Sequence, residues 1–303
     1  MKVIIIGGGN GMLSNSIGTF LKKSGHSVQV IGKTLPIEYR PEKFIKKDFL
    51  EDEIYITELL DSDVIIYAAG AGVQATIPVE AATIYTMNLQ IPIKLCLLLN
   101  KYGYQGAFVS FGSYMEIGNN SELYKLFTEK DLVHSCYCVT NDYSLSKRLF
   151  TRYIYDANFN FRNYHFILPN LFSKDETGMR LLPYVINYLK EIKRGGKIIK
   201  PRLSSGYQIR QYVYIEEVME AVFKCIEGKV TSGIYNIGGG QIATIKEFVA
   251  ELFEAFTVDL DEKMFGKEIR RDNDIQSLSL DNTKLWNTIN YSPTTKVTDI
   301  YHG

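Results

Sequence analysis

The chain has 303 residues, 46% hydrophobic and 22% charged, which is the balance of an ordinary globular protein with a substantial buried core. Lysine and arginine together number 34, as do aspartate and glutamate, so a formal net charge of zero gives no overall attraction for nucleic acid or an anionic membrane. We expect neither partner, since no apolar run approaches the roughly 20 residues that a membrane-spanning helix needs and the N-terminal segment is untypical of a signal peptide.

Strands and helices alternate along the first part of the chain. Short apolar runs predict strands at 3–6, 27–32, 63–70, 106–113 and 164–172. Helical segments are predicted between them, at 16–25, at 88–103 and around 141–150. This alternation predicts an α/β fold of the Rossmann type, with a doubly wound parallel sheet.

The pattern changes beyond residue 172. A helix is predicted near 180–193, followed by strand-to-helix units at 210–228 and 233–256. We therefore expect a dinucleotide-binding domain over residues 1–170, to which 205–237 return, and a smaller substrate-binding α/β region over 171–303. A ligand would bind between the two.

A glycine-rich turn, GGGNGMLS, follows the first predicted strand. Gly8 and Gly11 permit a sharp turn and a close approach of a pyrophosphate, and the backbone N–H groups of Met12 and Leu13 at the start of the next helix favour an anion. Ser14 stands where the usual pattern has a third glycine. The turn predicts a dinucleotide-binding site.

The end of the second predicted strand, VIGKT, favours NADP(H) over NAD(H). NAD-binding proteins generally carry an acidic side chain there, which bonds the ribose hydroxyls. Gly32 occupies that position and Lys33 follows it. A carboxylate would repel a 2′-phosphate, whereas a lysine attracts one.

The stretch NDYSLSKRLF, at 141–150, places Tyr143 and Lys147 on one face of a helix. With the strand and glycine turn before this pair, the chain resembles the extended short-chain dehydrogenase/reductase family, in its nucleotide-sugar branch, from about residue 3 to 293. The segments that carry the resemblance are GGNGMLSNSIGTFLKKSGH, YAAG, FVSFGSYMEIG, YSLSK, ILPNLF, RQYVYIEEVMEA, YNIGGG and RRDNDIQSLSLDNTKL.

The resemblance implies a set of site residues. The implied cofactor contacts, besides the glycine turn and Lys33, are Asp48 at the adenine amino group, the strand end Ala68, Ala69 and Gly70, and Tyr143 and Lys147. The implied catalytic residues are Ser113, Tyr143 and Lys147, and the implied substrate contacts are Ser113, Asn170, Arg210 and Arg271. No metal is implied. Ile117 stands where the family usually has tyrosine, and LFSK replaces the usual Tyr-Gly-Pro after Asn170.

These residues imply a carbonyl reaction. The Lys147 ammonium would lower the pKa of the Tyr143 phenol, which then gives its proton to the nascent alkoxide while Ser113 bonds the same oxygen. Tyr114 and Met115 stand where related 4,6-dehydratases carry an Asp-Glu pair, which argues against that reaction. Tyr114 also replaces the cysteine that bifunctional epimerase/reductases carry there.

We therefore predict NADPH-dependent reduction of the 4-keto group of a nucleotide-linked 6-deoxy sugar, for deoxysugar and surface-polysaccharide biosynthesis. Two alternatives stay open: a nucleotide-sugar 4-epimerase with tightly bound NAD, and a non-catalytic NADP-binding regulatory protein. The family resemblance also implies a homodimer formed through the helix around 91–99 and the Tyr143 helix. Four cysteines without C-x-x-C spacing favour a reduced, cytoplasmic protein: Cys96, Cys136, Cys138 and Cys225.

Overall fold

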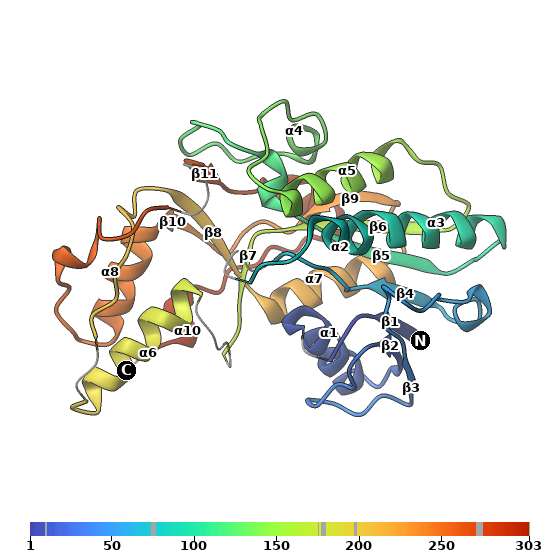
Figure 1. Ribbon diagram of the computed structural model, residues 1–303, viewed down its shortest axis with the longest axis horizontal. Helices are drawn as coiled ribbons and strands as arrows, with labels where there is room; N and C mark the ends of the chain where they lie inside the picture. Colours follow the sequence, from blue (N-terminus) through green and yellow to red (C-terminus); the bar gives the residue numbers. More distant parts are fainter. Residues whose placement is uncertain are drawn as a thin grey trace.

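The computed structural model describes residues 1–9, 11–73, 77–174, 176, 180–196, 199–270 and 275–302. A large α/β part holds the N-terminus, and a smaller part is built around a second sheet (Figure 1). The chain first passes from the large sheet to the small one between β6 and β7, on either side of Pro169.

The large sheet consists, in the described part of the chain, of seven parallel strands in the order β3-β2-β1-β4-β5-β6-β9. Their bounds are Lys2–Ile6 (β1), Ser27–Gly32 (β2), Lys43–Lys46 (β3), Val64–Tyr67 (β4), Ala107–Ser113 (β5), Arg162–Leu168 (β6) and Gly233–Asn236 (β9). The strand order reverses between β1 and β4. In such sheets, ligands bind beyond the carboxyl ends of the strands at this switch point.

Helices cover both faces of the large sheet. One face carries α1 (Met12–Lys23), α7 (Ile215–Glu227) and α9 (Thr283–Ile289), and the other carries α2 (Ala81–Tyr85), η2 (Thr86–Gln90), α3 (Ile91–Lys101), α4 (Glu129–Val133) and α5 (Asp142–Asp156). Side chains of β1 alternate between the two cores, with Val3 and Ile5 in one and Ile4 and Ile6 in the other. Burial on both faces explains the unbroken apolar run of this strand.

The smaller part packs helices against one sheet. Its elements are β7 (Asn170–Phe172), α6 (Leu181–Lys193), β8 (Ile209–Tyr214), β10 (Gln241–Thr244), α8 (Ile245–Ala255), β11 (Ser277–Leu278) and α10 (Val297–Ile300). Strand β8 pairs in parallel with β7 and β11 and antiparallel with β10. Phe172, Leu189 and Phe248 lie in the core of this part. Short 3-10 turns complete the described elements: η1 (Ile56–Glu58), η3 (Tyr114–Ile117) and η4 (Glu262–Met264).

The predicted fold class is confirmed, and the differences are local. Strand β3 was not predicted, and the helix expected at 88–103 begins at Ala81. The strand predicted over 164–172 is divided, because Pro169 cannot donate to a sheet and the chain changes sheets there. Within the range 205–237, β8 lies in the small sheet, whereas α7 and β9 lie with the large one.

One helical stretch among the described residues, Ala81–Lys101, is long and apolar enough to cross a membrane by length and composition alone. The sequence analysis had found no such stretch. In the fold, Leu95, Cys96 and Leu99 of this helix are buried against the sheet. Of the most apolar 18-residue stretch of the helix, 33% is buried.

Candidate active site

The glycine turn after β1 leads directly into α1. Gly11 is the N-cap of this helix, offers no side-chain cap, and is followed by no acidic residue in the first turn. The first N–H groups of a helix, which have no partner within the helix, attract an anion at such a start. The predicted contacts Gly8, Gly11, Met12 and Leu13 thus lie at the carboxyl edge of the sheet, where the fold can accept a dinucleotide phosphate.

Ser14 takes the place of a third glycine by bonding back to the turn. Its hydroxyl donates to the carbonyl oxygen of Gly8 at 2.6 Å. Ala68 lies against the same turn, because a Cβ added to Gly7 would be 3.3 Å from the Ala68 carbonyl carbon. The end of β4, with Ala68, Ala69 and Gly70, therefore lies beside the predicted cofactor turn.

Gly32, at the end of β2, has no room for a side chain. A Cβ there would lie 2.2 Å from the carbonyl oxygen of Gly7. Thr34 binds the turn from the same side, since the Gly9 N–H donates to its hydroxyl at 2.9 Å. The acidic ribose ligand common in NAD-binding folds is thus excluded here by backbone packing.

Lys33 and Asp48, which we expected to contact different parts of the cofactor, form an ion pair of 2.6 Å. The hydrogen bond to Asp48 raises the pKa of Lys33, and the same bond lowers the pKa of Asp48. The lysine side chain keeps 71% of its surface exposed. The pair stands beside the adenosine side of the predicted site, where Lys33 is accessible to an anionic group.

Ser113, Tyr143 and Lys147 come together where β5 ends and α5 begins. Asn141 caps α5 by accepting the Ser144 N–H at 2.8 Å, which starts the helix two residues before Tyr143. The Ser113 hydroxyl lies near enough to the Tyr143 phenol to lower the pKa of the phenol. Lys147 is buried one helical turn further on, and its ammonium donates to the carbonyl oxygen of Phe111 at 2.8 Å.

The titration of this set differs from our expectation in one respect. Burial raises the pKa of Tyr143 to about 12, and the Ser113 hydroxyl opposes this rise. Burial lowers the pKa of Lys147. The Lys147 ammonium donates to a backbone carbonyl rather than to the phenol, so it does not produce the lowered tyrosine pKa that the sequence suggested.

Asn88, which sequence analysis missed, ties this set to the end of β4. It is 1% exposed, accepts the Ala71 N–H at 2.9 Å, and donates to the Ala71 carbonyl at 2.9 Å and to the Ser146 hydroxyl at 3.1 Å. The Ser146 hydroxyl in turn donates to the Tyr143 carbonyl at 2.8 Å. An asparagine in an apolar helix was the available signal, because a buried amide needs partners.

Glu116 carries a second set of contacts that the sequence did not reveal. Its carboxylate accepts the Ser113 N–H at 2.6 Å and the Thr151 hydroxyl at 2.5 Å. The Thr151 oxygen lies 2.9 Å from Nε2 of His165, whose Nδ1 lies 2.8 Å from the Ser110 hydroxyl. Glu116, Thr151, His165 and Ser110 are all fully buried. His165 is therefore a core histidine rather than an acid exposed to substrate.

Two of the predicted substrate contacts, Asn170 and Arg210, lie near the starts of β7 and β8 in the small sheet. Asn170 begins β7, where it lies opposite Tyr212 and shares a side-chain hydrogen bond with it. Arg210 is 5% exposed and donates to the carbonyl oxygens of Ile209 and Ile275 at 2.6 and 3.0 Å. Arg271 lies outside the described residues.

Arg180, at the N-cap of α6, is a further cation on the substrate side. Its positive charge opposes the rise in the pKa of both Tyr143 and Tyr212, so the guanidinium acts on both phenols. It also pairs with the buried carboxylate of Glu176 at 2.7 Å. This arginine follows the LFSK segment, which departs from the usual Tyr-Gly-Pro, so the sequence alone did not single it out.

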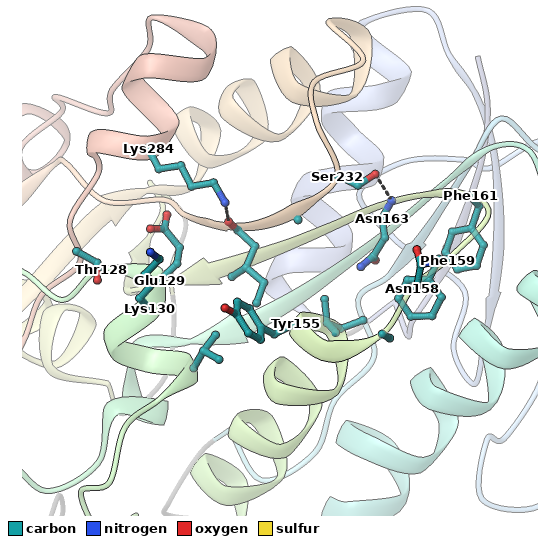
Figure 2. Close-up of a pocket in the computed structure, with 15 residues that line it drawn as sticks. Thr128, Glu129, Lys130, Tyr155, Asn158, Phe159, Phe161, Asn163, Ser232 and Lys284 are labelled. Carbon is teal, nitrogen blue, oxygen red and sulfur yellow. Dashed lines mark hydrogen bonds between the residues drawn. The ribbon is translucent and has the colours of Figure 1, made fainter.

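A cavity of about 550 Å³ lies away from these residues, between α4, the end of α5 and the start of β9 (Figure 2). Glu129 accepts the Asn236 N–H at 2.8 Å, and the Lys284 ammonium donates to the Ile234 carbonyl at 2.6 Å. None of the predicted cofactor or substrate contacts lines it. Among the described residues, no three His, Cys, Asp or Glu side chains form a group that could hold a metal ion.

The strand order, the glycine turn at the switch point and the Ser-Tyr-Lys set define a Rossmann-type protein of the extended short-chain dehydrogenase/reductase class. A model of the NAD dependent epimerase/dehydratase family matches residues 4–238, and the chain belongs to that family.

Relatives and solved structures match this chain at low sequence identity. An ADP-L-glycero-D-manno-heptose-6-epimerase from Nitratidesulfovibrio vulgaris is 21% identical over 285 residues, which cover 87% of this chain and 86% of that protein. The dTDP-glucose 4,6-dehydratase DesIV from Streptomyces venezuelae, solved with NAD, is 19% identical with a TM-score of 0.79, over 99% of this chain and 94% of DesIV. The UDP-glucose 4-epimerase from Thermotoga maritima, solved with UDP-glucose, is 19% identical with a TM-score of 0.76, over 98% of this chain and 95% of the epimerase.

Proposed function

We propose that the protein reduces the 4-keto group of a nucleotide-linked sugar with NADPH. The observation that carries the proposal is the set of Ser113, Tyr143 and Lys147 at the carboxyl end of β5, which β4 separates from the strand that leads into the glycine turn. Several solved structures of the same fold are described with NAD, with UDP or with a UDP-sugar, which supports this class of cofactor and substrate.

The residues fit a nicotinamide dinucleotide. The uncapped start of α1 would hold its pyrophosphate, and the contact of Gly7 with the end of β4 keeps the turn close to the sheet. Bound there, the dinucleotide would supply the hydride. Gly32 admits no carboxylate and Lys33 is exposed, so the adenosine side favours a 2′-phosphate and therefore NADPH.

The protein residues would handle the substrate oxygen. Ser113 and Tyr143 both present hydroxyl groups, and a phenol with a pKa of about 12 is protonated at neutral pH and ready to donate. As negative charge forms on the oxygen, Ser113 stabilises it by a hydrogen bond and Tyr143 gives up its proton. The Lys147 ammonium, which donates to the Phe111 carbonyl, would hold the nicotinamide ribose beside Tyr143.

Anionic groups of the substrate would bind on the side of the small sheet. Arg180 acts on the Tyr143 phenol, so it lies where a sugar diphosphate can approach the reacting group. Arginine suits this role because guanidinium binds phosphate oxygens in pairs. We keep Asn170, Arg210 and Arg271 as proposed substrate contacts, although Arg210 must exchange a carbonyl partner to bind phosphate.

Dehydration is disfavoured by the segment after Ser113. Tyr114 is buried and Met115 has no titratable group. Glu116, one position further, is fully buried and accepts bonds from Ser113 and Thr151, so it does not face substrate. A 4,6-dehydratase needs an exposed acid and base here, which this segment does not provide.

The test is an incubation of the purified protein with NADPH or NADH and a panel of CDP-, dTDP-, GDP- and UDP-linked 4-keto sugars. Loss of nicotinamide absorbance with NADPH and one nucleotide supports the proposal. Conversion of a 4-hydroxy nucleotide sugar to its epimer without added cofactor would establish the epimerase instead. NADPH binding without turnover of any sugar would favour the regulatory protein.

A further inference from the structure

Glu116 is a buried carboxylate directly beneath the proposed active site. It lies in η3, the turn that follows Ser113, and is 0% exposed. Its two oxygens accept from two different elements, the Ser113 backbone N–H and the Thr151 hydroxyl of α5. The carboxylate therefore fixes the end of β5 against the helix that carries Tyr143 and Lys147.

The Glu116 carboxylate accepts the hydrogen bonds that Ser113 and Thr151 donate, and further bonds lead from Thr151 to His165 and Ser110. Since the Thr151 hydroxyl donates to the carboxylate, its oxygen accepts from Nε2–H of His165, and Nδ1 of His165 then accepts from the Ser110 hydroxyl. Burial lowers the pKa of His165 to about 3, so this ring is neutral. These hydrogen bonds stabilise the ionised form of Glu116, whereas burial raises its pKa to about 7.

A buried carboxylate needs a positive partner, because an isolated charge is strongly disfavoured away from water. Among the described residues, two cations of α5, Lys147 and Arg148, influence the Glu116 carboxylate. Arg148 donates to backbone carbonyls, among them that of Glu116 at 2.6 Å. Lys147 acts on the carboxylate through its charge and has the Phe111 carbonyl as its acceptor. Tyr143 also faces Glu116 and is neutral at physiological pH.

We propose that Glu116 is a positioning residue, whose buried carboxylate holds the backbone at Ser113 and supplies the negative charge that keeps Lys147 an ammonium. The proposal rests on the proposed function, because Lys147 matters for turnover only if the Ser-Tyr-Lys set is catalytic. The charge relation between the two residues is a property of the free protein.

The two pKa shifts agree with this relation. Burial lowers the pKa of Lys147, and Glu116 is the opposing influence. Burial raises the pKa of Glu116, and Lys147 and Arg148 oppose that rise after the hydrogen bonds of Thr151 and Ser113. Removing the carboxylate leaves the effect of burial on Lys147 unopposed, so the lysine loses its proton at a lower pH.

The test is Glu116→Gln, which keeps the shape and one acceptor oxygen but removes the charge. We expect the titration midpoint of Lys147, followed by NMR of carbon-labelled lysine in the protein without cofactor or substrate, to fall by about one pH unit or more, roughly a tenfold change. The Lys147 signal is assigned as the lysine resonance that is missing from the spectrum of Lys147→Arg. The alkaline limb of the kcat/KM profile, which needs the ammonium, moves to lower pH in the same variant.

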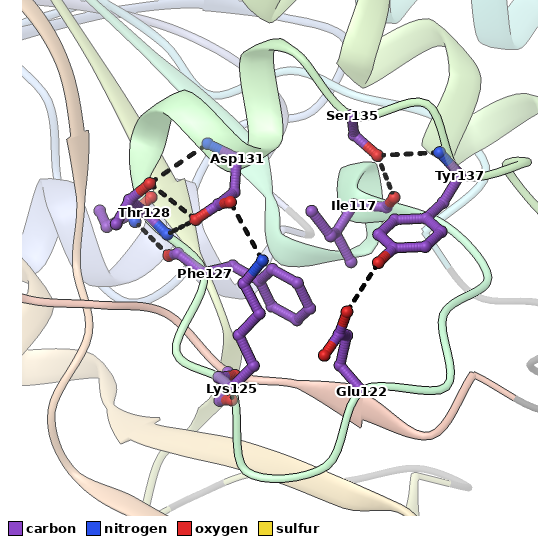
Figure 3. Close-up of polar contacts among 10 residues, drawn as sticks. Ile117, Glu122, Lys125, Phe127, Thr128, Asp131, Ser135 and Tyr137 are labelled. Atoms are coloured by element: carbon purple, nitrogen blue, oxygen red, sulfur yellow. Dashed lines mark hydrogen bonds and ion pairs between the residues drawn. The ribbon is translucent and has the colours of Figure 1, made fainter.

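Glu122→Gln is the matched control. Glu122 lies in the loop after η3 and accepts the Tyr137 hydroxyl at 2.9 Å (Figure 3). Its charge is not among the influences on Lys147, so the lysine midpoint should not move. If Glu116→Gln does not fold, Thr151→Val tests the same relation, because loss of the hydroxyl makes Glu116 harder to ionise and lowers the Lys147 midpoint by a smaller step.

The outcomes separate the two proposals. An unchanged Lys147 midpoint in a folded Glu116→Gln protein overturns the role of Glu116, whatever the enzyme reduces. A lowered midpoint without turnover of any nucleotide sugar supports the charge relation and leaves the proposed reaction to be rejected. A kcat/KM profile that falls uniformly, without a shift of its alkaline limb, also contradicts the proposal, since it indicates a merely structural role.

Discussion

The phenol of Tyr143 is the group on which the proposed chemistry most depends. Tyr143→Phe removes the proton and keeps the ring, so we expect kcat to fall by roughly 10²–10⁴-fold, the usual contribution of a general acid. NADPH affinity should change little, because the ring stays in place. Stopped-flow turnover and fluorescence titration of NADPH measure the two. Tyr155→Phe, on an exposed side of the same helix, is the control, and equal turnover in both variants would reject the acid role.

A second prediction at the residue scale concerns Arg180. Arg180→Gln removes a charge near the Tyr143 phenol, so we expect KM for the nucleotide sugar to rise by roughly 10- to 100-fold, the value of a charged hydrogen bond to phosphate. The double variant Glu176→Gln/Arg180→Gln avoids leaving the buried Glu176 unpaired. Arg194→Gln breaks an exposed pair at the other end of α6 and should leave KM unchanged. An unaltered KM in the double variant would remove Arg180 from the substrate site.

Site residues with a characteristic spacing in the chain could be predicted from the sequence. Residues that come together only through tertiary contacts were missed. Tyr143 and Lys147 are separated by one helical turn, so the pair was visible in the chain. Glu116 and Thr151 are 35 positions apart, and their contact exists only because α5 packs over the end of β5. The same packing places the Lys147 ammonium against the Phe111 carbonyl rather than the Tyr143 phenol. For this reason the expected lowering of the tyrosine pKa was wrong.

At the scale of elements, the end of β2 determines which cofactor the fold accepts. Gly32→Ala would place a methyl group 2.2 Å from the Gly7 carbonyl oxygen. We expect a loss of about 1–3 kcal/mol in the free energy of unfolding from this overlap, together with weaker NADPH binding. Urea unfolding and a binding titration measure the two effects.

The control for this position is Gly196→Ala, in the exposed turn after α6, where the nearest atom is the end of the flexible Glu191 side chain. It should lose little stability. A Gly32→Asp protein that folded normally and gained NAD affinity would show that the backbone yields there, contrary to the packing.

Helices and strands could be predicted wherever the sequence has a clear apolar run or a regular apolar pattern. The run in β1 and the start of α1 follow from residue pattern and glycine chemistry alone. β3 was missed because KFIK is short and half exposed, so it has no distinct apolar pattern. The break at Pro169 and the pairing of β7 with β8 depend on contacts between segments about 40 residues apart, which a local pattern does not contain.

At the scale of the whole molecule, the apolar helix Ala81–Lys101 raises the question of what covers its outer side. Leu97 of α3 is 57% exposed, and Leu149 of the neighbouring α5 is 37% exposed. We propose that a second copy of the chain packs here, because a two-fold contact lets the same helices cover each other.

Leu97→Asp tests this arrangement. A carboxylate in an apolar interface loses its hydration without gaining a partner, so we expect the variant to be monomeric at concentrations where the natural chain is dimeric. Light scattering on a sizing column, in buffer without detergent, measures the mass of each. Leu123→Asp, at a loop position that is 63% exposed, should leave the dimer intact. A natural chain that is monomeric without detergent would reject the dimer, and one that is recovered only with detergent would assign the apolar helix to a membrane instead.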